Sequence, residues 1–208
     1  MCDVSLISRF MESPKDSHWK VGKQILRYIA RTTNCCILYS NTKSNDLVGY
    51  TDSDFSESVD DRKSTSRYVF HFGSGVISWA SKKHPIVTIS SAEAEYVAAT
   101  AATCQAIWLR KILKYIQQEQ DGPTTVYCDN NSTITLLKNH VFHQKIKHID
   151  TKYHFIRDLV NDGEIYLEFC RSNVQLTDVF TKPLAKDVCE FHRENLGIVQ
   201  VVVVSGRN

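Results

Sequence analysis

"GYTDSDF", residues 49–55, is the stretch that decides the fold of this chain. Together with Leu47 and Val48 it forms a β-prone run, and the polar, charged residues 56–66 predict where the strand ends. The strand is apolar along its body and acidic at its tip, so it places carboxylates at one edge of a sheet. Such carboxylates repel one another, and a divalent cation is the simplest species that offsets the repulsion.

The composition describes a globular chain without a strong overall charge. Its 208 residues are 42% hydrophobic and 23% charged, which allows a buried core and argues against disorder. The formal net charge is only +2, so any nucleic-acid site must be a local surface. The seven cysteines contain no C-x-x-C pair and are odd in number, which argues against a zinc site and a disulfide framework. They suit a reducing compartment, the cytoplasm or alternatively the nucleus, and no signal peptide or membrane span is expected.

The order of the expected elements predicts an α/β fold. Strands are expected at 47–54, 68–72, 76–80, 124–128 and 165–170, and helices at 91–118, 132–138, 148–161 and from 176 onward. A helical crossover connects the first strand to the fourth, so the pattern indicates a mixed sheet covered by helices. The preceding segment is expected to hold a helix that starts at Ser13-Pro14 and a short strand at 36–39.

Four acidic residues stand at the ends of separate expected elements. Asp52 ends the first strand, Asp129 follows the fourth, Asp178 lies near the start of the last helix, and Glu95 lies near the start of the long helix. Each acid alone would also suit a turn, a helix terminus or a solvated helix face. Together they predict a cation site. Oxygen ligands without paired Cys or His favour Mg²⁺ or Mn²⁺ over zinc.

Glu93 and Glu95 are expected to play different roles. They are two residues apart, which separates them by about 200° around a helix. The sequence from Ser90 to Glu93 matches a capping box, in which Glu93 would reach back to the amide of Ser90. Glu95 instead shares a face with small alanines, so we expect it to face the sheet.

Eight motifs of the chain occur between residues 47 and 185. They are GYTDSDF, DRKSTSRYVF, ISWASKK, SSAEAEYVA, IWLRKIL, YCDNNSTI, KHIDTKYHFIRD and LTDVFTKPL. In this order they closely resemble the ribonuclease H domain of copia-type LTR retrotransposon polyproteins. The resemblance implies a ribonuclease H-like fold, a five-stranded mixed sheet with helices on both faces. The domains expected from it are a reverse transcriptase remnant at 1–40, a ribonuclease H domain at 41–198 and a tail at 199–208.

The resemblance also implies a site and an activity. The site would be Asp-Glu-Asp-Asp, formed by Asp52, Glu95, Asp129 and Asp178. The activity would be metal-dependent hydrolysis of the RNA strand of RNA/DNA hybrids with two Mg²⁺ ions, or Mn²⁺ in their place. A reverse transcriptase domain is an expected partner. Three alternatives stay open. One is an inactive retroelement-derived module that only binds nucleic acid, and another is an integrase-like enzyme, although integrases order their acids Asp-Asp-Glu. The third is a structural role of the helix in residues 1–40 as a docking surface for a reverse transcriptase.

Two segments are expected to contact the substrate. The polar helix start after Asp129 carries backbone amides that can hold a phosphate. Residues 138–157 contain five Lys or Arg, one acid and four His, which indicates a phosphate track or, alternatively, an ordinary solvated basic face. The expected contacts are Asn130, Ser132, Thr133, Lys145, Lys147 and His148.

Two residues depart from the pattern of the resembled family. Arg67 stands in STSRY where Gly is usual, and His84 follows SKK where Gln is common. Neither is one of the four acids. Arg67 is expected to strain a turn that Gly would accept.

Overall fold

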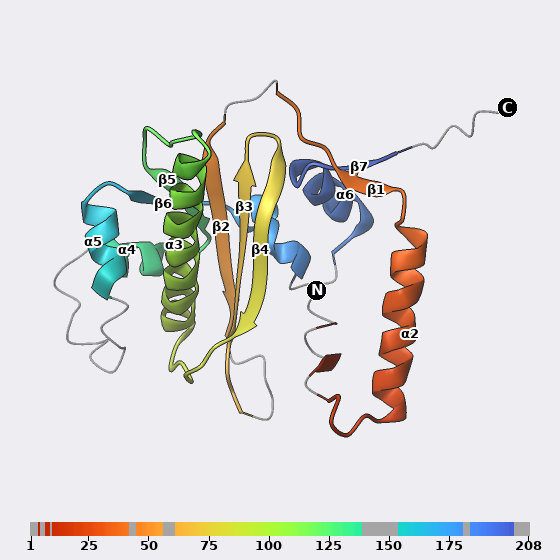
Figure 1. Ribbon diagram of the computed structural model, residues 1–208. Helices are drawn as coiled ribbons and strands as arrows, with labels where there is room; N and C mark the ends of the chain where they lie inside the picture. Colours follow the sequence, from red (N-terminus) through yellow and green to blue (C-terminus); the bar gives the residue numbers. More distant parts are fainter. Residues whose placement is uncertain are drawn as a thin grey trace, which may run out of the picture.

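A five-stranded mixed sheet forms the centre of the computed structural model, which describes residues 4, 7–8, 10–41, 45–55, 61–138, 154–180 and 184–201 (Figure 1). In spatial order its strands are β4 (Gly75–Lys83), β3 (Thr65–Phe72), β2 (Leu47–Asp54), β5 (Thr124–Cys128) and β6 (Ile165–Phe169). Strands β2, β3 and β4 pair antiparallel, whereas β5 runs parallel to β2 and β6 parallel to β5. The carboxyl ends of β2 and β5 therefore meet at one edge of the sheet.

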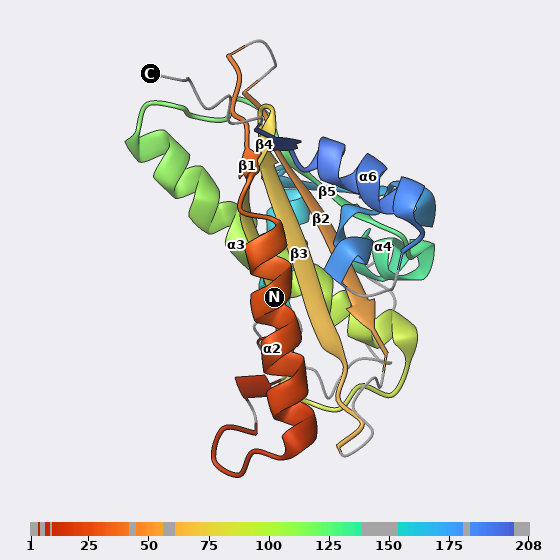
Figure 2. The same ribbon diagram turned by 90° about the vertical axis from the view of Figure 1, so that its right-hand side faces the viewer.

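Helices cover both faces of this sheet. Helix α3 (Ser91–Tyr115) packs on one face, with α4 (Asn131–Lys138) and α5 (His154–Asn161) on the same side (Figure 1). The 3₁₀ helix η4 (Leu176–Phe180) and helix α6 (Lys186–Asn195) lie on the opposite face (Figure 2). The expected α/β fold, a five-stranded mixed sheet with helices on both faces, is confirmed.

Strand alternation divides the core into two clusters. Leu47 and Phe70 pack in the larger cluster together with residues of α3, and Tyr50 and Val69 belong to the cluster that contains residues of η4. The larger cluster depends on the small residues of α3, because fully buried alanines let the helix backbone approach the strands. These alanines are Ala94, Ala98, Ala99, Ala102 and Ala106.

The last expected helix differs most from the structure. Residues 176–180 form the short 3₁₀ helix η4, and the α-helix begins only at Lys186. Pro183 in the intervening sequence explains the difference, because proline lacks an N–H donor and its predecessor avoids the α conformation. The N-terminal helix α2 (Asp16–Arg31) also differs, because its N-cap position is Lys15 rather than the expected Ser13.

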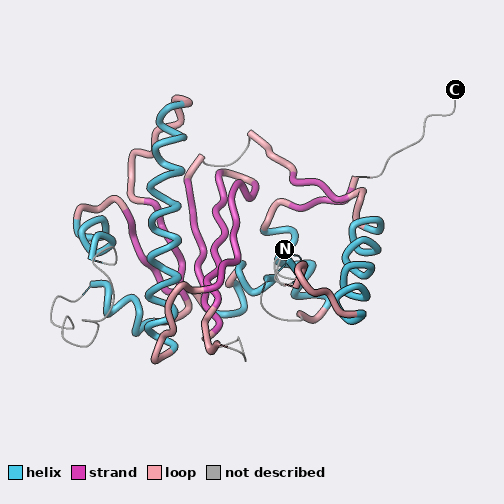
Figure 3. Tube along the Cα trace, turned by 60° about the horizontal axis from the view of Figure 1, so that its bottom comes forward, coloured by secondary structure: helices cyan, strands magenta, loops and turns pink. Residues whose placement is uncertain are grey.

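The two ends of the described chain form a second, two-stranded sheet. Strand β1 (Cys35–Ile37) pairs antiparallel with β7 (Ile198–Gln200). Helix α2 buries none of its side chains and lies apart from the five-stranded sheet (Figure 3). The domain boundaries at 40/41 and 198/199 stay predictions; the β1–β7 pairing joins segments that these boundaries separate.

The cysteines of the described ranges form no disulfide. Cys128 and Cys170 are buried, and the others are Cys35, Cys36, Cys104 and Cys189. Within the same ranges, no helix combines the length and the apolar character needed to cross a membrane.

Gly197→Ala is expected to destabilise the fold by about 2 kcal/mol. Gly197 has φ +74°, and an added Cβ would lie 2.7 Å from the carbonyl oxygen of Ser74. Both the left-handed backbone and the clash penalise alanine. Urea unfolding of Gly197→Ala and of Gly122→Ala tests this, because an added Cβ at Gly122 meets nothing within 4 Å. Equal unfolding midpoints for the two variants would contradict it.

Candidate active site

Asp52 and Glu95 meet near the end of the central strand. Both side chains are buried, at 5% and 6% exposure, and their carboxyl groups share a hydrogen bond. The backbone N–H of Ser53 donates to Glu95 Oε1 at 3.2 Å, which fixes the Glu95 carboxyl at the tip of β2. The prediction that Glu95 faces the sheet is confirmed.

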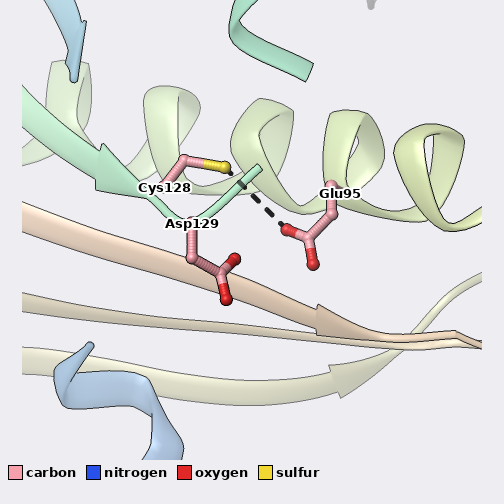
Figure 4. A group of neighbouring side chains, drawn as sticks. All are labelled: Glu95, Cys128 and Asp129. Atoms are coloured by element: carbon pink, nitrogen blue, oxygen red, sulfur yellow. Dashed lines mark hydrogen bonds between the residues drawn. The ribbon is translucent and has the colours of Figure 1, made fainter. Parts of the chain in front are cut away.

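Asp129 joins this pair from the end of the neighbouring strand. Glu95, Cys128 and Asp129 each offer a potential ligand atom, and these atoms lie within 4.8 Å of one another (Figure 4). The Cys128 thiol points toward Glu95 and donates to Oε2 at 4.0 Å. Asp129 is half-buried and immediately follows β5. The parallel pairing of β2 and β5 thus brings together acids that are far apart in the sequence.

Asp178 approaches the same region from the opposite face of the sheet. It lies in η4 and is 6% exposed. Burial is the main cause that raises the pKa of the Cys170 thiol to about 12, and the charges of Asp129, Asp178 and Asp52 contribute to this rise. The three aspartates therefore lie near enough to this thiol for their charges to act on it, although Asp178 is not part of the compact group of Glu95, Cys128 and Asp129.

The charges of Asp52, Glu95, Asp129 and Asp178, together called the acidic centre, fit a hard divalent cation. Burial and, after it, the neighbouring charges of Asp52 and Asp129 together raise the pKa of Glu95 to about 9. A divalent cation would relieve this repulsion. Burial also raises the pKa of Cys128, so its sulfur stays a neutral thiol and a poor metal ligand. The remaining oxygen donors suit Mg²⁺ or Mn²⁺ better than zinc.

Glu93 caps helix α3 and takes no part in the acidic centre. Its backbone N–H donates to Ser90 Oγ at 3.2 Å, as the sequence predicts. Its carboxylate accepts a hydrogen bond from the Ile89 N–H at 2.7 Å, one residue before the predicted partner Ser90. The two glutamates therefore have the separate roles expected of them.

The predicted substrate contacts at the start of α4 need correction. Asn130 Oδ1 accepts hydrogen bonds from the backbone N–H groups of Ser132 and Thr133, at 2.9 and 3.3 Å. The expectation that these amides are free is therefore wrong: the Asn130 side chain caps them. Thr133 is fully buried, and its hydroxyl donates to the carbonyl of Ala92 at 3.2 Å. Ser132 is exposed. Contact of Asn130, Ser132 and Thr133 with substrate stays a prediction.

Most of the basic track, residues 139–153, falls outside the described residues. Lys145, Lys147 and His148 all lie in the range 139–153, which the structure does not describe. Their contact with a phosphate backbone also stays a prediction.

Arg67 does not lie in a strained turn, contrary to expectation. It is an interior residue of β3, paired with Asp52 of β2, and the non-glycine residues of the described ranges with positive φ are Arg62 and Gln117. Its side chain is 1% exposed and forms an ion pair with Asp54, Nη1 to Oδ2 2.5 Å. The sequence motif could not show that this residue pairs across the sheet with the first acid.

Sequence reasoning missed several neighbours of the acids. Gln175 Nε2 donates to the Thr51 carbonyl at 2.9 Å, which ties η4 and its Asp178 to β2. His192 is buried, and its pKa is lowered by burial, with the charge of Asp178 opposing the shift. Cys128 directly precedes Asp129, but strand alternation places neighbouring residues on opposite faces and so gives no signal for it; no sequence signal marks Gln175 or His192 either.

His84 is expected to make the fold less stable in acid. It is 3% exposed, its Nε2 lies 2.5 Å from Ser66 Oγ, and burial lowers its pKa from 6.5 to about 4, partly opposed by the charge of Glu93. The unfolded chain therefore binds a proton at a higher pH than the folded chain. The contribution of His84 to the free energy of unfolding is fully present above pH 6.5. It falls by roughly 3 kcal/mol as the pH drops to about 4.

Denaturant unfolding at several pH values between 4 and 7.5 measures this loss in the wild type and in His84→Gln. The variant cannot take up the proton, so its stability should depend less on pH in this window. Identical pH profiles for the two proteins would show that His84 does not carry the effect.

The chain is similar to parts of much longer polyproteins, although no family model matches it. Over 195 residues, 94% of the chain, it is 39% identical to the retrovirus-related Pol polyprotein from transposon TNT 1-94 of Nicotiana tabacum, of which it spans 14%. It is 34% identical over 198 residues, 95% of the chain, to that of transposon RE2 of Arabidopsis thaliana, again spanning 14%. RNase H1 of Halobacterium salinarum is similar in structure, with a TM-score of 0.40 and 14% identity over 70% of this chain and 98% of that one.

Proposed function

The chain belongs to the retrovirus-related Pol polyproteins of copia-type transposons, and on this premise we propose that it hydrolyses the RNA strand of RNA/DNA hybrids in a metal-dependent reaction. The observation that carries the proposal is the meeting of Asp52, Glu95 and Asp129 in a largely buried position, with Asp178 close by. Buried carboxylates would weaken a surface that only binds nucleic acid, because they repel phosphates. They are useful where a cation bridges protein and phosphate.

The four acids are assigned to two Mg²⁺ ions, with Mn²⁺ as a substitute. Bound cations of this kind supply activated water and neutralise charge on the scissile phosphate and leaving oxygen. The chain's own contribution is to orient the carboxylates. Adjacent parallel strands fix Asp52 and Asp129, the Ser53 amide holds Glu95, and the Gln175 hydrogen bond ties the segment carrying Asp178 to β2.

Glu95 also holds a proton that the site must release. Its pKa of about 9 keeps the carboxyl protonated at neutral pH in the absence of a cation. A cation favours the ionised form of a neighbouring carboxyl, so loading of the site displaces this proton to solvent. Metal binding should therefore strengthen as pH rises.

The substrate and partners are part of the same proposal. Discrimination of RNA from DNA requires contact with the 2′-hydroxyl, and we infer the RNA preference from membership of the family. A reverse transcriptase domain is the proposed protein partner, and the cytoplasm or the nucleus the proposed location.

A cleavage assay with three duplexes tests the proposed function. The purified chain is incubated with end-labelled RNA/DNA hybrid, double-stranded RNA or double-stranded DNA, with Mg²⁺, with Mn²⁺ or with chelator. We expect cleavage of the RNA strand of the hybrid only when metal is present. Hybrid binding without cleavage under either metal would favour the alternative of an inactive binding module.

A further inference from the structure

Arg67 places a buried positive charge beside the acidic centre. Its side chain is 1% exposed, and its Cα pairs directly with that of Asp52 across the β2–β3 ladder. Residues opposite each other in an antiparallel pair share a face of the sheet, as do residues two apart on one strand. Asp52, Asp54 and Arg67 therefore lie on the same face of the sheet.

The contact with Asp54 determines where this charge acts. A guanidinium stays protonated at all ordinary pH values, and a buried charge needs a partner to persist in the fold. Arg67 Nη1 lies 2.5 Å from Asp54 Oδ2, and the Asp54 side chain is 29% exposed. The pair is neutral as a whole, so Asp54 adds little net charge to the centre and Arg67 is directed to Asp54.

We propose that Arg67 and Asp54 form a charge-balancing pair that sets the affinity of the acidic centre for divalent cations. Removal of the Asp54 charge would leave the Arg67 charge acting on Asp52, where it competes with a cation. Removal of the Arg67 charge would instead add the carboxylate of Asp54 to the field of the centre. Both are positioning residues that act through Asp52, and the inference rests on the metal site of the proposed function.

Titration calorimetry with Mg²⁺, on the full chain without nucleic acid, tests the pair. A unit charge within several ångströms of a partly buried cation changes its Kd by about tenfold. We expect Asp54→Asn to weaken Mg²⁺ binding by about tenfold and Arg67→Met to strengthen it by a similar factor. The double variant restores the wild-type charge and should bind within about twofold of the wild type, and Arg67→Lys should change the Kd less than Arg67→Met.

Glu164→Gln is the matched control. Glu164 also forms an ion pair with a mostly buried arginine, because its Oε2 lies 3.2 Å from Arg110 Nε. Glu164 precedes β6, so it lies at the end of the sheet opposite the acids. Its loss should leave the Mg²⁺ affinity unchanged.

Several results would overturn the inference. They are an Asp54→Asn affinity equal to or tighter than that of the wild type, an equal effect of Glu164→Gln, and no Mg²⁺ binding by any of the proteins. If Arg67→Met does not fold, Asp54→Asn decides alone, since Asp54 is partly exposed. Cleavage of the hybrid without the expected order of affinities refutes only the pair, whereas the expected order without cleavage refutes only the proposed function.

Discussion

Asp129→Asn is expected to reduce hybrid cleavage by about a thousandfold or more while leaving the fold and hybrid binding intact. Asparagine keeps the size of the side chain and one oxygen but loses the charge that holds a cation. Loss of a single group that stabilises developing charge already costs about 10²–10³ in rate. Asp129 is only half-buried, so the substitution should disturb the core little. Single-turnover cleavage of labelled hybrid in saturating Mg²⁺ measures the rate, and fluorescence anisotropy measures binding.

Asp52→Asn should show the same loss of cleavage, but its interpretation needs a stability measurement. Asp52 shares a hydrogen bond with Glu95 and is 5% exposed, so the change also alters a buried contact. Asp162→Asn provides the control, because Asp162 is an exposed acid just beyond α5. Near wild-type cleavage by Asp129→Asn or Asp52→Asn would refute the assignment of the acids.

Local signals in the sequence account for much of the fold. Strands β2 and β5 have the predicted bounds, because each is a β-prone run that polar or turn-forming residues terminate. The inward orientation of Glu95 followed from helix geometry, the capping box at Glu93 and the alanines that share the face of Glu95. These features depend on residues close together in the chain, so a single sequence contains the information.

Features that depend on a particular strand register or on a particular side-chain contact could not be predicted in this way. Arg67 was interpreted as a turn residue, whereas the β2–β3 register places it opposite Asp52. The Asn130 cap at α4 removes amides that the sequence left free for phosphate. The first feature depends on the register of two strands and the second on a side-chain contact to backbone amides, and residue type alone specifies neither.

In the presence of chelator, the fold is expected to lose stability as pH rises. Glu95 has a folded pKa of about 9 against an ordinary value of 4.5. The unfolded carboxyl therefore ionises first, and the stability that the protonated group contributes is lost between pH 4.5 and about 9. The loss should amount to a few kcal/mol. His84 acts in the opposite direction and only below pH 6.5, so a series above neutral pH isolates Glu95.

Glu95→Gln separates this titration from other effects of pH. Glutamine is a neutral isostere, so the variant should melt at a higher temperature than the wild type in chelator at about pH 8 and should show a flatter pH profile. Mg²⁺ should stabilise the wild type under these conditions, because a ligand that binds only the folded state raises its stability, and it should stabilise the variant much less.

Glu93→Gln is the control, because Glu93 is a buried glutamate of the same helix that caps the Ile89 amide. A wild-type melting temperature in chelator that is constant from neutral pH to pH 9 would contradict the prediction. The expected result would mean that Glu95 both destabilises the cation-free fold and makes the stability of the fold respond to the cation. This combination is expected where a site is selected for activity rather than stability.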